Sequence, residues 1–160
     1  LGQYVALKQS DRQRTAKAMG VSYLLVDGYN IIHAWKELDE LAKINMDSAR
    51  DRLLDIMCNY QGMKKCELIV VFDAYRLAGH AQEYIDYHNI HVVYTKEAET
   101  ADMYIEKVTH EIGKKHNVTV ATSDGLEQMI VIGSGAYRMS AREFEQEIKK
   151  TEKEIGEMIE

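Results

Sequence analysis

Four aspartates stand in this sequence where they could act together on a substrate. Asp27, Asp73 and Asp124 each follow a short run of β-favouring, mainly apolar residues. Asp102 lies in the first turn of a helix expected from about Thr100, where the helix dipole favours an ionised carboxylate. Because ligands bind at the carboxyl ends of the strands in a parallel α/β sheet, we expect these acids to share one edge.

Such a group of carboxylates indicates metal chemistry. Like charges held together are costly unless cations neutralise them. Oxygen ligands without His or Cys suit Mg²⁺ or Mn²⁺ better than zinc, and these ions activate water for phosphodiester cleavage. We therefore expect Asp27, Asp73, Asp102 and Asp124 to be metal ligands and catalytic residues. Any one of them alone is better explained as a turn former or helix cap.

Polar and basic side chains near the same strand ends are candidates for binding the substrate. Asn30 can orient a water or a ligand through its amide, and Ser123 can donate to a carboxylate or a phosphate. Arg76 and Lys96 are candidate phosphate contacts, with solvated surface charge as an equally good reading.

A glycine and three tyrosines flank the acidic motifs. Gly28 follows Asp27 and would allow a tight turn and a close approach of the backbone to a phosphate. Tyr29, Tyr75 and Tyr104 follow acidic positions and are suited to stack on the bases of a single strand. Core packing is an equal alternative for Tyr104, which borders an apolar helix stripe.

The elements that must position these residues alternate along the chain. Short β-rich runs are each followed by a longer stretch with helical periodicity. The runs are 23–26, 68–72, 90–94, 118–122 and 136–139. Near-continuous apolar strands joined by crossover helices belong to a parallel sheet covered on both faces. The sequence predicts a three-layer α/β sandwich with a mainly parallel five-stranded sheet.

Three polar residues mark expected helix starts. Asp47 precedes an apolar stripe that begins at Ala49, and a helix of about four turns is expected from Thr100. Ser140 and Glu143 have the spacing of a capping box.

Length and composition indicate one domain. The 160 residues are 46% hydrophobic and 29% charged, without a run of eighteen apolar residues or a secretory leader. We expect a soluble, cytoplasmic protein with no membrane partner. The net charge of −6 argues against indiscriminate coating of nucleic acid, so an RNA substrate would need local basic groups or a larger partner.

The first twenty residues differ from the rest of the chain. Residues 1–20 contain four basic residues and one acidic residue. This segment is either a basic extension that touches RNA or a remnant of an expression vector, and residues 21–160 are expected to form the domain.

Taken in order, the acidic motifs resemble a known family. They are Val26–Ile32, Val71–Tyr75, Thr100–Ile105 and Thr122–Gly125. Their order and spacing are similar to those of the NYN domain of the YacP type, a branch of the PIN-like nucleases, from about Tyr23 to the helix after Ser140.

The resemblance implies a PIN-like fold and a single-strand endoribonuclease that uses Mg²⁺ or Mn²⁺. In it, Asp27, Asp73, Asp102 and Asp124 match the acidic positions of the family. It also implies mRNA as substrate and the ribosome as a partner, because YacP-type proteins look like ribosome-dependent mRNA endonucleases.

Two other functions are weighed against this one. A phosphohydrolase acting on small phosphorylated molecules would need a second Asp two residues after its nucleophile, and here Gly28 and Tyr29 follow Asp27. A non-catalytic RNA- or ribosome-binding PIN-like module ranks second. It predicts loss of some acids, and although all four are present, the presence of ligands does not prove turnover.

Overall fold

The computed structural model describes residues 22–125 and 135–159. The extension expected over residues 1–20 lies outside this range. The described elements are, in chain order, β1 (Ser22–Asp27), α3 (Gly28–Ala34), α4 (Lys36–Ile44), α5 (Met46–Lys64), β2 (Glu67–Phe72), β3 (Glu83–Tyr87), β4 (Ile90–Tyr94), α6 (Ala101–Ile112), β5 (Asn117–Ala121), β6 (Tyr137–Met139) and α8 (Ala141–Ile159).

The strands form one sheet in the order β3-β4-β2-β1-β5-β6, and all neighbouring pairs except β3 with β4 are parallel. The mainly parallel sheet is therefore confirmed. From β1 the chain proceeds to β2 on one side, and it later returns to β5 on the other side. The strand order thus reverses between β1 and β5, which is where α/β sheets commonly bind ligands.

The sheet has six strands where five were expected. The additional strand is β3, which lies at the edge and pairs antiparallel with β4 across the turn at His88 and Asn89. Four of its five residues are exposed. A strand with little buried surface has no apolar run, so the pattern used for the other strands did not find it.

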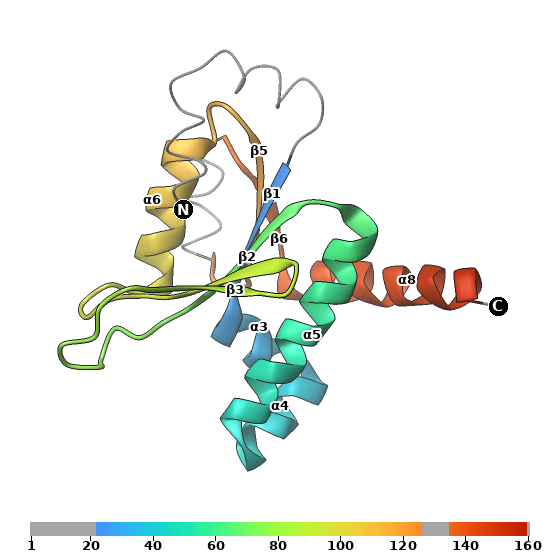
Figure 1. The fold of residues 1–160 in the computed structure, drawn as a ribbon, viewed down its shortest axis with the longest axis horizontal. Coiled ribbons are helices and arrows are strands. Elements are labelled where there is room, and N and C mark those ends of the chain that lie inside the picture. The colour runs from blue at the N-terminus through green and yellow to red at the C-terminus, as the bar shows by residue number, and fades with distance from the viewer. Residues whose placement is uncertain (1–21, 126–134, 160) are drawn as a thin grey trace.

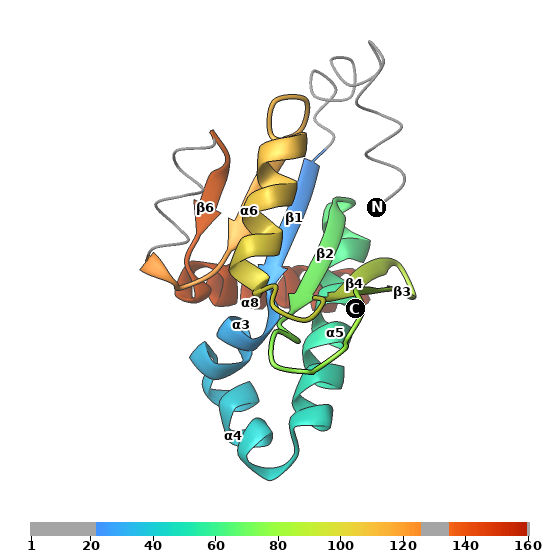
Figure 2. The ribbon, with the colours of Figure 1, turned by 90° about the vertical axis from the view of Figure 1, so that its left-hand side faces the viewer.

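Alternate residues of the central strands face two separate cores. Leu24 and Val26 pack on the face covered by α3, α5 and α8, whereas Tyr23 and Leu25 pack against α6. Figure 1 shows α5 and α6 on opposite sides of the sheet, and Figure 2 shows α6 in front with α8 behind. This arrangement confirms the three-layer sandwich.

Helix caps fix where the connecting helices begin. The capping box is confirmed: Ser140 Oγ accepts from the Glu143 N–H at 3.1 Å, and the Glu143 carboxylate accepts from the Ser140 N–H at 3.2 Å. Thr100 caps α6, which has 12 residues and is slightly shorter than four turns. The cap of α5 is Asn45 and not Asp47, so that helix begins slightly before the expected position.

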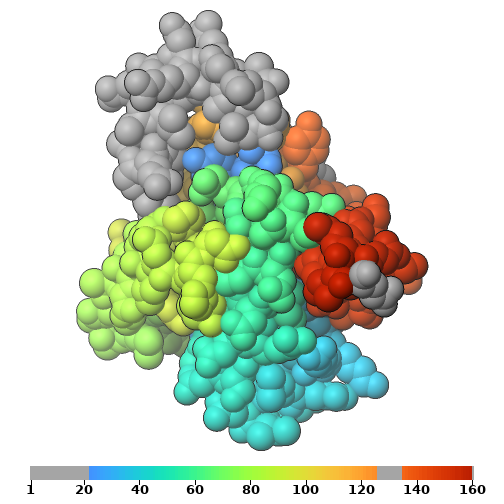
Figure 3. Space-filling view, turned by 45° about the vertical axis from the view of Figure 1, so that its right-hand side comes forward, coloured from blue at the N-terminus to red at the C-terminus, as the bar shows by residue number. Residues whose placement is uncertain are grey.

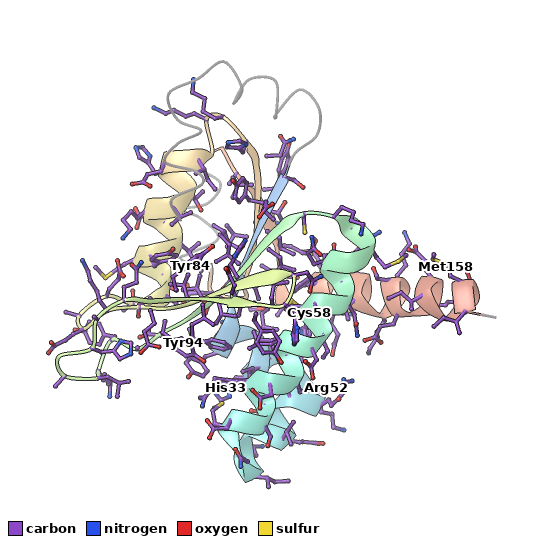
Figure 4. The ribbon with its side chains drawn as sticks, viewed as in Figure 1. His33, Arg52, Cys58, Tyr84, Tyr94 and Met158 are labelled. Atoms are coloured by element: carbon purple, nitrogen blue, oxygen red, sulfur yellow. The ribbon has the colours of Figure 1, made fainter. Side chains whose placement is uncertain are left out.

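On the molecular surface, α5 lies between the β3–β4 hairpin and α8 (Figure 3). The Tyr87 hydroxyl at the end of β3 donates to Asp55 at 3.0 Å, and Lys64 pairs with Glu147 of α8 at 3.4 Å. Tyr84 and Tyr94 lie on opposite faces of the hairpin (Figure 4). No helix in the described part of the chain has the length and apolar character needed to cross a bilayer.

Candidate active site

Asp27 is the last residue of β1 and is 7% exposed. It directly precedes α3, yet its side chain makes no capping hydrogen bond to that helix. Its Oδ2 instead accepts a hydrogen bond from the Thr122 hydroxyl at 3.3 Å. The common structural explanation for an Asp after a strand, helix capping, therefore does not apply to Asp27.

The loop after β5 brings Asp124 to the same strand ends. The backbone N–H of Asp124 donates to Thr122 Oγ1 at 3.1 Å, so Thr122 contacts both acidic positions. A second tie runs from the Ser123 N–H to Asn30 Oδ1 at 2.7 Å, and Ser123 Oγ accepts from the backbone N–H at the start of α8 at 3.1 Å. Asn30 and Ser123, which the sequence predicts as substrate-binding residues, hold this loop in place in the structure.

Asp73 follows β2 directly and is exposed. Its Oδ1 accepts from the Tyr75 N–H at 2.7 Å, which is the turn-forming role that short polar side chains often have. The adjacent Ala74 N–H donates to the hydroxyl of Thr95, a fully buried residue. Thr95 is not among the residues expected from the sequence. It directly follows the apolar strand β4, as Thr122 directly follows β5, and this position is the sequence signal that could have identified it.

Asp102 lies in the first turn of α6 and is half-buried. Just before this helix, Glu99 is 6% exposed and pairs through Oε2 with Lys107 at 3.1 Å. The second oxygen, Oε1, is buried without a hydrogen-bond partner. The start of α6 therefore has a buried carboxylate beside the expected catalytic one.

A hollow of about 550 Å³ adjoins Asp73. It is lined by Tyr29, Asp73, Ala74, Tyr75, Arg76, Leu77 and Thr100. Thr100 is the cap of the helix that carries Asp102, so the hollow connects the β2 end of the edge with the start of α6. Lys96 is exposed in the loop that follows β4 and does not line this hollow.

The tyrosines of the acidic motifs have different surroundings. Tyr104 is fully buried, so core packing is the correct reading for it. Tyr29 packs on Phe72 at a centroid distance of 4.9 Å, and Phe72 stacks on Tyr94 at 5.4 Å. Burial is the main cause that raises the pKa of Tyr94 above its usual value, so the Tyr94 hydroxyl stays protonated at neutral pH.

Gly28 is required by packing. A Cβ at this position would lie 2.4 Å from Cε1 of Phe72, whose ring is fully buried. The close approach seen here is thus between the backbone and an aromatic ring, whereas the sequence suggested an approach to a phosphate.

The four aspartates reach the same edge of the sheet without forming a compact cluster. Within residues 22–125 and 135–159, no three His, Cys, Asp or Glu side chains are grouped closely enough to hold a metal ion together. Mg²⁺, however, commonly takes one or two carboxylates and keeps several waters. The oxygen-only donor set therefore fits Mg²⁺ or Mn²⁺ in its chemistry.

Comparison with known proteins gives consistent matches. The family model described as "YacP-like NYN domain" matches residues 24–160. The protein YacP of Bacillus subtilis strain 168, described as uncharacterized, is 42% identical over 137 residues, which cover 85% of this chain and 80% of that protein.

Two solved structures share the fold. The crystal structure of Rae1 (YacP) from Bacillus subtilis is 40% identical, with a TM-score of 0.72 over 86% of this chain and 79% of that chain. A point mutant of the same protein is 40% identical and matches with a TM-score of 0.73 over 84% and 79%.

Proposed function

Because the chain belongs to the YacP-like NYN domain family, we propose that it is a metal-dependent endoribonuclease that cleaves single-stranded RNA. In this proposal its natural substrate is mRNA on the ribosome, and the protein is located in the cytoplasm. Membership of a PIN-like nuclease family and the match to a solved YacP fold support its assignment as an RNA nuclease.

The observation that carries the proposal is the position of Asp27. This buried carboxylate lies at the point where the strand order reverses, does not cap its helix, and is joined through Thr122 to the Asp124 loop. Burying a charged carboxylate is costly, and a carboxylate buried at such a strand end is a candidate for a functional role.

In this proposal Asp27 and Asp124 would hold a Mg²⁺ or Mn²⁺ ion, with Asp73 and Asp102 as further carboxylates at the same edge of the sheet. When bound, the ion would supply an activated water and stabilise the leaving oxygen. Thr122 fixes the orientation of the Asp27 carboxylate, while Arg76 and Lys96 contact the RNA backbone. Because the net charge is −6, the ribosome would place the mRNA that the enzyme itself attracts weakly.

The test is cleavage of an mRNA under translation in a reconstituted system that contains Mg²⁺ or Mn²⁺, with new RNA ends mapped. We expect wild-type protein to cut only when ribosomes are present. Asp27→Asn should reduce cleavage to background while the far-ultraviolet circular dichroism stays unchanged. Glu152→Gln, an exposed acid-to-amide change on α8, is the matched control and should cut normally.

Two other results would contradict parts of this proposal. Undiminished cleavage by Asp27→Asn would exclude Asp27 as a metal ligand. Ribosome binding without cleavage in any condition would favour the non-catalytic RNA- or ribosome-binding module.

A further inference from the structure

The hollow beside Asp73 has walls that differ from an ordinary protein surface. Tyr75 is 44% exposed and Leu77 is 58% exposed, so two large apolar side chains are left in water on one short loop. The Tyr75 ring stacks on no other aromatic ring of the described residues. Apolar surface gathered in a concave place is typical of a binding site.

Two other residues of the lining are held in place by contacts within the fold. The Tyr29 hydroxyl accepts from Arg50 at 3.0 Å, and its ring packs on Phe72. Thr100, also in the lining, is fixed as the cap of α6 by a hydrogen bond at 3.1 Å. Tyr29 and Thr100 are therefore lining groups that the fold already holds.

Backbone and side-chain hydrogen bonds also fix the loop that carries Tyr75. The Tyr75 carbonyl accepts from the Ala98 N–H at 3.0 Å, and the Gly79 N–H donates to the Glu97 carboxylate at 2.8 Å. The His80 ring contacts the Thr95 carbonyl at 3.0 Å. Tyr75 is thus presented by a loop tied to the segment after β4, which lowers the entropy lost on binding.

The charges around the hollow fit a nucleotide of an RNA strand. Arg76 is the one basic residue among the described residues of the lining, and no ion pair with a described acid occupies it. A guanidinium beside an exposed aromatic ring can bind a phosphate while the ring stacks on a base. Asp73, which also lines the hollow, connects it to the proposed reaction edge.

We propose that this hollow is a nucleotide subsite in which Tyr75 stacks on one unpaired base of the RNA and Arg76 binds its phosphate. The inference rests on the proposed function and adds a substrate contact to it. Because a paired base cannot leave its helix without cost, the subsite gives the enzyme a preference for single strands. Tyr75 contributes to binding of the RNA strand and takes no part in cleavage of the phosphodiester bond.

The test is a nuclear magnetic resonance titration of the ¹⁵N-labelled full chain with short single-stranded oligoadenylate, in a metal-free buffer with EDTA. The method measures weak binding and removes cleavage from the experiment. We expect the amide signals of residues 74–79 and 97–100 to shift on titration. Tyr75→Ala should weaken binding about tenfold or more, and Tyr75→Phe should retain it.

Two control variants separate the subsite from general effects. Tyr137→Ala removes a tyrosine that is more exposed than Tyr75, from β6 at one edge of the sheet, and should leave the affinity unchanged. Arg76→Ala should lower the slope of log affinity against log salt by about 0.7, the value for one phosphate contact on a single strand. Lys153→Ala, which removes an exposed cation on α8, should leave that slope unchanged.

The outcomes distinguish this inference from the proposed function. Shifts that appear elsewhere, no binding, or an affinity unchanged by Tyr75→Ala would overturn the subsite, whether or not wild-type protein cleaves mRNA. Expected shifts and a weakened Tyr75→Ala variant would support it even if the translation assay yields no cleavage, and only the nuclease proposal would then fail.

Discussion

The hydroxyl of Thr122 donates to the carboxylate of Asp27 at 3.3 Å, across the boundary between β5 and β1 where the strand order reverses. The same oxygen accepts from the backbone N–H of Asp124 at 3.1 Å. One buried side chain thus orients one proposed metal ligand and fixes the loop that carries another. Loss of the Thr122 hydroxyl should therefore lower both the stability and the activity of the protein.

Thr122→Val tests this double role because valine has nearly the same shape and no hydroxyl. We expect the free energy of unfolding to fall by about 1–3 kcal/mol, since a buried carboxylate oxygen and a backbone N–H lose a partner. Urea denaturation measures the change, and RNA cleavage should decrease as well. Thr151→Val is the control, because the buried Thr151 hydroxyl donates only to a helix carbonyl, at 2.9 Å. This substitution should change the free energy of unfolding by less than about 0.5 kcal/mol. Equal stabilities of the two variants would contradict the prediction.

Gly28→Ala should destabilise the protein. The added Cβ would lie 2.4 Å from the fully buried ring of Phe72, which has little room to move. We expect a loss of about 1–3 kcal/mol in unfolding free energy, measured by urea denaturation. Gly62→Ala is the matched control in α5, where a Cβ would meet no atom within 4 Å. That change should stabilise the helix by about 0.5–1 kcal/mol, so the two substitutions should have opposite signs.

The parts of the fold that local pattern decides could be read from the sequence. The buried parallel strands have continuous apolar runs, and the caps at Thr100 and Ser140 stand three residues before their partners. Other features depend on distant contacts. The break between α3 and α4 falls at Trp35, whose ring N–H donates to the Ala141 carbonyl at 2.8 Å, 106 residues along the chain.

The same division holds for the candidate site. The alternation of strands and helices places Asp27, Asp73 and Asp124 at one edge, because each lies at or just after the end of a parallel strand. Strand ends alone do not determine the distances between side chains, so the sequence suggested a compact cluster that the described residues do not form. The hollow could not be foreseen, since its loop is held by bonds such as Gly79 to Glu97, 18 residues apart.

The pair formed by Glu99 and Lys107 should stabilise the protein mainly by compensating a buried charge. Lys107→Met keeps the apolar stem but leaves the Glu99 carboxylate, only 6% exposed, without its cation. We expect a loss of about 1–3 kcal/mol in the urea-derived free energy of unfolding. Adding Glu99→Gln should recover part of it, because the uncompensated charge is then absent. A double variant whose loss equals the sum of the two single losses would show that the groups are not coupled.

The capping box at the start of α8 should make stability depend on pH. Hydrogen bonds to Glu143, first from the side chain and then from the backbone of Ser140, lower the pKa of its carboxyl below the usual value. A group whose pKa is lowered by folding stabilises the protein above its unfolded pKa of about 4.3, and this contribution is lost as pH falls through the folded pKa. We therefore expect wild-type protein to be more stable than Glu143→Gln at pH 7, with a difference that closes towards pH 3. Thermal unfolding across this range measures it.

Ser140→Ala supplies the control for that pH dependence. It removes the side chain that makes the larger contribution to the pKa shift and should cost about 0.5–2 kcal/mol as a lost helix cap at neutral pH. In the Ser140→Ala background, Glu143→Gln should have a smaller effect on stability, and that effect should vary less with pH. A stability difference that widens as the pH falls would require the pKa of Glu143 to be raised by folding, and the capping box would then not be its cause.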